Sequence, residues 1–334
     1  MIVWLASYPR SGNTLLRTVF KQTMDLSSRT DSLDENGHGD DPSGVWTRLV
    51  GVEPIKSDWQ TFYQQASESD TVYLVKTHHH PIDAQPAIYV VRDGRKACLS
   101  YLHFHRSFRD GGSLAGIVSG LSECGDWSSH YRAWSQRART MVVRYEDLLN
   151  PTENTLTMLA SAVSYAGAIA SWTNPFEELQ KSDRKFFREG EVAWKGAPEW
   201  TPIIDALFFH LHRDLMAELG YIETADAGSV VPLPDEFRQL IEGVRALSLR
   251  SLALHRRNDL LQAVCDERLD LINHLTQQCE LRNQAYLAAD QRARESSSEL
   301  LALQNLGKAE KRGMRMRRLL RFFKKIRAQA RISP

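Results

Sequence analysis

Four short apolar segments constrain the fold of this 334-residue chain more than any other feature. They are rich in β-branched and aromatic side chains with little polar alternation, and they span residues 2–7, 72–76, 87–91 and 141–144. Such segments are typical of strands buried on both faces of a parallel sheet. Because helical patterns lie between or after them, the sequence predicts an α/β fold with a three-layer parallel sheet.

The predicted helices complete this alternation. Helical patterns occupy residues 14–24, 95–105, 127–138, 153–165 and 203–219. Residues 30–44 are rich in Asp, Ser and Gly and are predicted to form a loop. The small apolar stretch over residues 114–122 is predicted to be a loop or a short helix above the functional site.

From about residue 235 the pattern changes to a long helical seam. Between Leu240 and Leu303, nineteen positions recur in alternating steps of four and three, and about fourteen of them are apolar. A seam of this length favours a coiled coil, which as one helix would be roughly 95 Å long. It would join a second copy of the chain or a partner protein. The alternative is two antiparallel helices packed on the preceding domain.

The resulting organisation has four parts. We expect the first domain over residues 1–222, a linker over 223–234, a helical coiled-coil segment over 235–306 and a basic amphipathic tail over 307–334. The linker is marked by ETADAGSVVPLPD, which combines Gly, Pro and acidic residues.

The tail carries most of the chain's charge asymmetry. The formal net charge is +1, but eleven Lys or Arg and one Glu follow Gly307, so the tail is about +10 and the rest about −9. Apolar tail residues recur at helical spacing, at Met316, Leu319, Leu320, Phe323 and Ile326. This pattern predicts a helix lying on an anionic membrane surface. A disordered basic end is the alternative, and nucleic acid is the less favoured partner.

Two features bear on the compartment. The four cysteines show no CxxC spacing, which predicts reduced thiols rather than a disulfide framework or a zinc site. No run of about 18 apolar residues could span a membrane, and the first apolar run is too short for a signal sequence. We therefore expect a cytoplasmic protein that is peripheral to a membrane at most.

The turn after the first strand predicts an anion site. The turn reads Arg10-Ser11-Gly12-Asn13-Thr14 and opens a helix, whose first N–H groups lack internal partners. Gly12 allows a bulky anion to approach the backbone, and Arg10 adds a charged fork that suits phosphate or sulfate. The nucleotide-hydrolase pattern GxxxxGK[ST] is absent. An ordinary strand–turn–helix capped by Ser is the alternative.

The other strands also end in polar residues. Lys76 and His78 follow the second strand, Arg92 and Ser100 follow the third, and Tyr145 follows the fourth. Ligand crevices of α/β sheets lie at this edge, and His is the usual general base near neutral pH. His78, His79 and His80 could suggest a metal, but alternate strand residues face opposite sides and no Cys or carboxylate cluster is nearby. We predict no metal.

Five of these segments together resemble one family. SYPRSGNT resembles the phosphosulfate loop YPKSGTTW of the cytosolic-type sulfotransferases, and KTH resembles the strand that carries their catalytic histidine. VVRDGRKACLSYLHFHR resembles their 3′-phosphate motif, RYEDL the next element, and FFREGEVAWKG their RKGxxGxWK segment. The resemblance covers about residues 1–222, in the same order, and implies a P-loop-like fold. It implies transfer of a sulfuryl group from 3′-phosphoadenosine 5′-phosphosulfate (PAPS) to a hydroxyl or amine.

The resemblance also implies residue roles. The 5′-phosphosulfate would be held by Arg10, Ser11, Gly12, Asn13 and Thr14, the 3′-phosphate by Arg92 and Ser100 beneath Arg188 and Gly190, and the adenine by Tyr145 and Phe176. His78 would take the acceptor proton, while Lys76 and Arg10 stabilise charge on the leaving phosphate. The acceptor is not named by any motif; the tail favours a glycan or a lipid-linked glycan.

Two departures from the family keep alternatives open. Arg10 stands where the family has Lys, and Glu189 places a carboxylate where the family has Lys beside the 3′-phosphate. A noncatalytic sulfotransferase-like binding module is therefore one alternative. A small-molecule kinase is the other, disfavoured by the absent GK[ST] and by the Arg92 and Ser100 pair.

Overall fold

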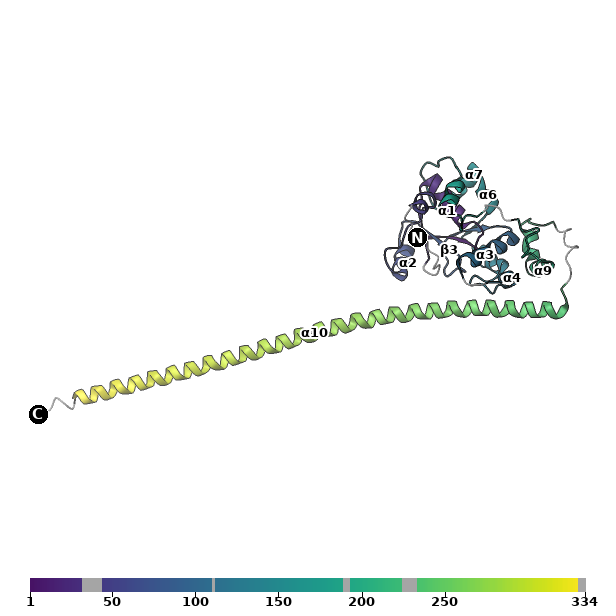
Figure 1. The fold of residues 1–334 in the computed structure, drawn as a ribbon. Helices are drawn as coiled ribbons and strands as arrows, with labels where there is room; N and C mark the ends of the chain where they lie inside the picture. Colours follow the sequence, from purple (N-terminus) through teal and green to yellow (C-terminus); the bar gives the residue numbers. More distant parts are fainter. Residues whose placement is uncertain (32–43, 110–111, 189–192, 224–232, 330–334) are drawn as a thin grey trace. The chain divides into compact units, whose positions relative to one another are not determined.

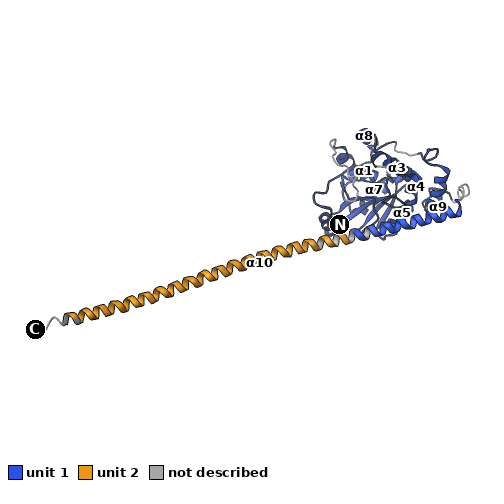
Figure 2. Ribbon diagram, turned by 60° about the horizontal axis from the view of Figure 1, so that its bottom comes forward, with its two compact units in different colours: residues 1–260 blue, residues 261–334 orange. Residues whose placement is uncertain are grey.

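The computed structural model of the chain describes residues 1–31, 44–109, 112–188, 193–223 and 233–329. The chain divides into two compact units, residues 1–260 and 261–334 (Figure 2). The predicted linker over 223–234 lies almost entirely outside the described residues.

The first unit is built on a five-stranded parallel sheet. Its strand order is β2-β3-β1-β4-β5. The strands are β1 (Ile2–Ser7), β2 (Ser28–Thr30), β3 (Tyr73–Thr77), β4 (Ala87–Val91) and β5 (Thr140–Arg144). The four predicted strands are confirmed. The edge strand β2 was not predicted because its three residues, Ser-Arg-Thr, contain no apolar run, and Thr30 falls in the predicted loop.

Alternate residues of β1 explain why its sequence is apolar throughout. Ile2 and Trp4 pack into one core cluster, whereas Val3 and Leu5 pack into the other. A strand covered on both faces has no solvent-facing positions, so the hydrophobic run is continuous.

Helices cover both faces of the sheet, which gives three layers (Figure 1). One face carries α1 (Asn13–Met24), α6 (Tyr145–Leu149) and α7 (Glu153–Ala162). The other carries α2 (Trp59–Glu68), α3 (Gly94–Phe108), α4 (Leu114–Ser119), α5 (Trp127–Ser135) and α9 (Pro202–Glu218). The short helices η1 (Trp46–Val50) and α8 (Phe176–Ser182) share a smaller cluster.

The C-terminal region is one helix, α10 (Asp235–Gln329), of 95 residues. At 1.5 Å per residue it is about 140 Å long, so the alternative of two antiparallel helices is wrong. The helix continues through Gly307 and Gly313, without a break where the basic tail begins. The partner of the apolar seam stays a prediction. Within the described ranges, no helix is long and apolar enough to cross a membrane.

Candidate active site

A cavity of about 790 Å³ lies at the carboxyl edge of the sheet. Its lining includes residues that follow four parallel strands: Arg10 after β1, His78 after β3, Arg92 after β4 and Tyr145 after β5. This is the edge at which α/β sheets form ligand crevices, because the loops there diverge from neighbouring strands. The structure thus brings the sequence-predicted residues of four separate motifs to one cavity.

The β1–α1 turn has the features of an anion cradle. Gly12 caps α1 with φ 111° and, having no side chain, supplies no side-chain cap to the first amides of the helix. A Cβ on Gly12 would lie 2.5 Å from Cδ2 of Tyr145, so only glycine fits there. Asn13 ties the turn to β1, its Nδ2 donating to the Leu5 carbonyl at 2.7 Å. Among the residues that the structure describes, the buried Ser11 hydroxyl has no hydrogen-bond partner.

The Arg10 side chain extends from the β1–α1 turn to the segment that follows α8. Its backbone has φ 63°, a conformation that residues with a Cβ rarely adopt. Its Nε lies 3.3 Å from Ser100 Oγ, and its NH2 group donates to the Phe186 carbonyl at 3.0 Å. Burial, with the nearby Arg92 cation, lowers the pKa of Arg10 to about 10. Arg10 therefore links the turn to the residue predicted for the 3′-phosphate.

His78 is held in the tautomer that a general base needs. Its Nδ1 lies 2.8 Å from the Ser7 carbonyl oxygen. Because a carbonyl only accepts, Nδ1 carries the proton and Nε2 is free of one. Burial, reinforced by the Lys76 cation, holds the pKa of His78 well below its usual range. The imidazole is therefore neutral and able to accept a proton at Nε2.

Lys76, near the end of β3, is a second cationic side chain of the cavity, in addition to Arg10. Burial and the Arg17 and Arg10 cations lower the pKa of Lys76 to about 7, although Asp31 opposes them. An ammonium poised near neutrality gains its proton when an anion binds beside it. Its charge is therefore coupled to occupancy of the cavity.

Arg92 and Ser100 add further polar groups to the cavity, next to Arg10. Arg92 is only 5% exposed, and its Cζ lies 4.2 Å from the centre of the Tyr145 ring. Its NH1 group donates to the Arg10 carbonyl at 3.3 Å. Ser100, two turns along α3, faces Arg10. Two cations, Arg10 and Arg92, and the Ser100 hydroxyl thus lie close together beside the β1–α1 turn.

The predicted closing residues are only partly described. Phe176 and Arg188 line the cavity, and the Phe186 ring lies 4.5 Å from Arg10 Cζ. Gly190 and Glu189 lie outside the described residues, so their predicted contribution stays a prediction.

Several lining residues escaped the sequence reasoning. Arg17 and Thr18 lie one helical turn beyond Asn13 and Thr14, and Lys96 lies one turn beyond Arg92. Helical spacing from the predicted residues could have found these three. Glu123 and Cys124, from the α4–α5 loop, also line the cavity, and no sequence signal marked them.

The histidine triplet does not gather into a cluster. His78 bonds to Ser7, whereas Nε2 of His80 lies 3.1 Å from the Cys124 carbonyl oxygen. Among the residues that the structure describes, no group of three or more His, Cys, Asp or Glu side chains is arranged to hold a metal ion.

Comparisons with known proteins identify the family. The family model described as "Sulfotransferase domain" matches residues 2–163. Mouse sulfotransferase SULT7A1 complexed with PAP is 17% identical, with a TM-score of 0.44 over 66% of this chain and 88% of that one. Retinol dehydratase with androsterone and the inactive cofactor PAP is also 17% identical, with a TM-score of 0.44 over 64% and 81%. No curated protein sequence matches. Residues 2–163 thus match a sulfotransferase domain, and this domain implies a PAPS-dependent sulfotransferase.

Proposed function

We propose that this protein transfers a sulfuryl group from PAPS to an acceptor hydroxyl or amine, with His78 as general base. The observation that carries the proposal is the neutral His78, whose Nδ1 faces the Ser7 carbonyl, in a cavity that is also lined by Lys76, Arg10, Arg92 and Ser100. Cationic and hydroxyl side chains at the start of α1 and at Arg92 and Ser100 suit a donor with phosphates at both ends of its ribose.

The residues present fit such a donor. The start of α1, with the unpartnered Ser11 hydroxyl and Gly12, would hold the 5′-phosphosulfate. Arg92 and Ser100, with Arg188, would hold the 3′-phosphate, and Tyr145 and Phe176 the adenine. These are the residues that the sequence predicted as donor ligands. Arg10 would contact both the 5′-phosphosulfate and the 3′-phosphate, because its guanidinium reaches Ser100 from the β1–α1 turn.

The chemistry follows from charge. When bound, PAPS supplies an activated sulfuryl group whose bond to the 5′-phosphate breaks as the bond to the acceptor oxygen forms. His78 accepts the acceptor proton at Nε2. Lys76 and Arg10 neutralise the negative charge that develops on the departing phosphate. Stabilisation of developing charge is usually the largest single contribution to catalysis.

The acceptor that these surroundings favour is polyhydroxylated, such as a glycan or a lipid-linked glycan. Arg109 and Glu123 both line the cavity and form an ion pair of 2.7 Å. Charged groups of this kind form strong hydrogen bonds with the hydroxyl groups of a glycan. A screen with ³⁵S-labelled PAPS and oligosaccharides, glycolipids, phenols and peptides tests this. Label in the glycan arms alone supports the proposal, and label only in phenols contradicts the acceptor class.

We also propose that the basic tail docks on anionic lipid. Met316, Leu320 and Phe323 lie on one side of α10 and are 64%, 58% and 60% exposed, while the opposite side is rich in Lys and Arg. An exposed apolar stripe flanked by cations suits an anionic bilayer surface. Flotation with phosphatidylserine vesicles should recover the full chain but not a chain ending at Gly307. Equal flotation of both proteins contradicts the proposal.

A further inference from the structure

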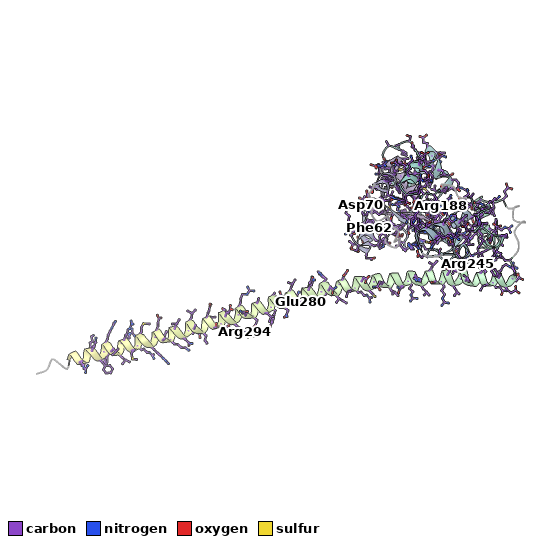
Figure 3. All side chains as sticks on the ribbon, in the orientation of Figure 1. Phe62, Asp70, Arg188, Arg245, Glu280 and Arg294 are labelled. Carbon is purple, nitrogen blue, oxygen red and sulfur yellow. The ribbon has the colours of Figure 1, made fainter. Side chains whose placement is uncertain are left out.

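The first turns of α10 lie on the sulfotransferase domain within the first unit. Ile241 is 6% exposed and belongs to the core cluster. Arg245, labelled in Figure 3, pairs with Asp126, Nε to Oδ2, at 3.1 Å. Ser248 donates to the Gly120 carbonyl, and a Cβ on Gly125 would lie 2.9 Å from Leu252. Residues 241, 245, 248 and 252 share one helical face, and that face holds the loop over residues 120–126.

This loop forms part of the cavity. Glu123 and Cys124 line it, and the Cys124 carbonyl is bonded by His80, two residues beyond His78. Asp126 is 1% exposed and caps α5, accepting from the Ser129 amide at 2.8 Å. A buried carboxylate that loses its cation is costly, so Arg245 stabilises the loop in this position.

The helix that Asp126 caps holds the backbone of the histidine segment. His130 Nε2 donates to the His78 carbonyl at 2.9 Å, and Trp134 Nε1 donates to the His79 carbonyl at 2.9 Å. Nδ1 of His130 accepts from the Tyr89 hydroxyl at 2.9 Å. His130 is fully buried, and burial lowers its pKa to about 4, so both bonds are those of a neutral imidazole. The contacts therefore run from α10 through the loop and α5 to His78.

We propose that Arg245 is a positioning residue for the sulfuryl-transfer site: its pairing with Asp126 holds the 120–126 loop and α5, and so sets the acceptor side of the cavity and the backbone of His78. The proposal rests on the sulfuryl-transfer function proposed above. It makes the first turns of α10 part of the catalytic unit, although they lie beyond the domain over residues 2–163.

Thiol alkylation of the full chain tests the proposal without an acceptor. Cys124 and Cys98 are buried, whereas Cys265 and Cys279 are exposed and serve as internal references. With iodoacetamide and peptide mass spectrometry, Arg245→Met should raise the alkylation rate of Cys124 by about tenfold or more, because the loop opens locally. Cys98 should stay protected. Arg245→Lys should restore part of the protection, and the exposed Arg250→Met is the matched control.

Turnover supplies the second measurement. With an acceptor sulfated in the screen above, Arg245→Met should raise the acceptor KM or lower kcat while the PAPS KM stays within about twofold. Protection of Cys124 equal to that of the unmodified chain overturns the proposal. Equal exposure of Cys98 and Cys124 also overturns it, because Arg245 would then stabilise the whole domain. If no acceptor is sulfated but Cys124 alone is exposed, the loop role stands while the proposed function fails.

Discussion

The two walls of the cavity are held in different ways. The donor wall, formed by the β1–α1 turn with Arg92 and Ser100, is built by elements of the central sheet and their following helices. The opposite wall is the 120–126 loop, which is held by Arg245, 119 residues from Asp126. The first wall is intrinsic to the family domain, whereas the second depends on a helix outside it. One wall is therefore positioned by local elements of the sheet, whereas the other depends on a contact that is distant in the sequence.

The largest expected effect comes from His78, which lines the same cavity. His78→Ala should lower sulfuryl transfer by about 10²–10⁴-fold, because the acceptor loses its general base. Calorimetry should show the affinity for 3′,5′-adenosine bisphosphate nearly unchanged, since Arg92 and Ser100 remain. His255→Ala, on the exposed part of α10, is the control. Full activity of His78→Ala would remove it as the base.

The next effect isolates the donor wall. Arg92→Met should weaken 3′,5′-adenosine bisphosphate binding by about 10- to 100-fold, because a charge-assisted hydrogen bond to the 3′-phosphate is lost. Binding of adenosine 5′-monophosphate, which lacks that phosphate, should hardly change. The exposed Arg213→Met is the matched control. Equal losses for both nucleotides would place Arg92 elsewhere in the site.

A smaller effect concerns pH. Burial lowers the pKa of Lys76 to about 7, so its ammonium is present below that pH and lost above it. A bound dianion favours the charged form, so bisphosphate affinity should fall as pH rises from 7 to 9, by at most about tenfold per unit. Calorimetry in buffers of different ionisation enthalpy should detect proton uptake on binding at pH 8. Lys76→Met should remove both effects, and a flat affinity profile in the unmodified chain contradicts this role.

The smallest effect extends the comparison to the exposed part of α10. Cys265 and Cys279 are exposed and lie fourteen residues apart, on the predicted seam. If the seam joins two parallel chains in register, mild oxidation should give disulfides between like cysteines. Mass spectrometry of the linked peptides identifies the pairs. A chain that stays monomeric in light scattering at micromolar concentration contradicts a seam between copies.

The four longer strands and the polar residues that follow them could be predicted because their signals are local. Apolar runs locate β1, β3, β4 and β5, and the polar residues directly after them share one edge of the sheet. The strand β2 was missed because its place depends on pairing with β3, and not on a hydrophobic run of its own.

The opposite wall could not be predicted for a different reason. The sequence-based seam counted apolar positions such as Leu240 and Leu247, which are 61% and 67% exposed. The face of α10 that lies on the domain is instead one residue further on, at Ile241, Arg245 and Ser248. Two of its contacts, those of Arg245 and Ser248, are polar, and their partners lie far away in the chain, so hydrophobic periodicity does not predict them.

The most direct test of the donor site is a calorimetric titration of the full chain with 3′,5′-adenosine bisphosphate, adenosine 5′-monophosphate and ATP–Mg²⁺. We expect the bisphosphate to bind at least about tenfold tighter than the monophosphate. Only the bisphosphate carries a 3′-phosphate, which Arg92 and Ser100 would hold while the β1–α1 turn holds the 5′-phosphate. ATP–Mg²⁺ should bind weakly. Tighter binding of ATP–Mg²⁺ would contradict the account and favour a kinase, and binding of none of the three would favour a noncatalytic module.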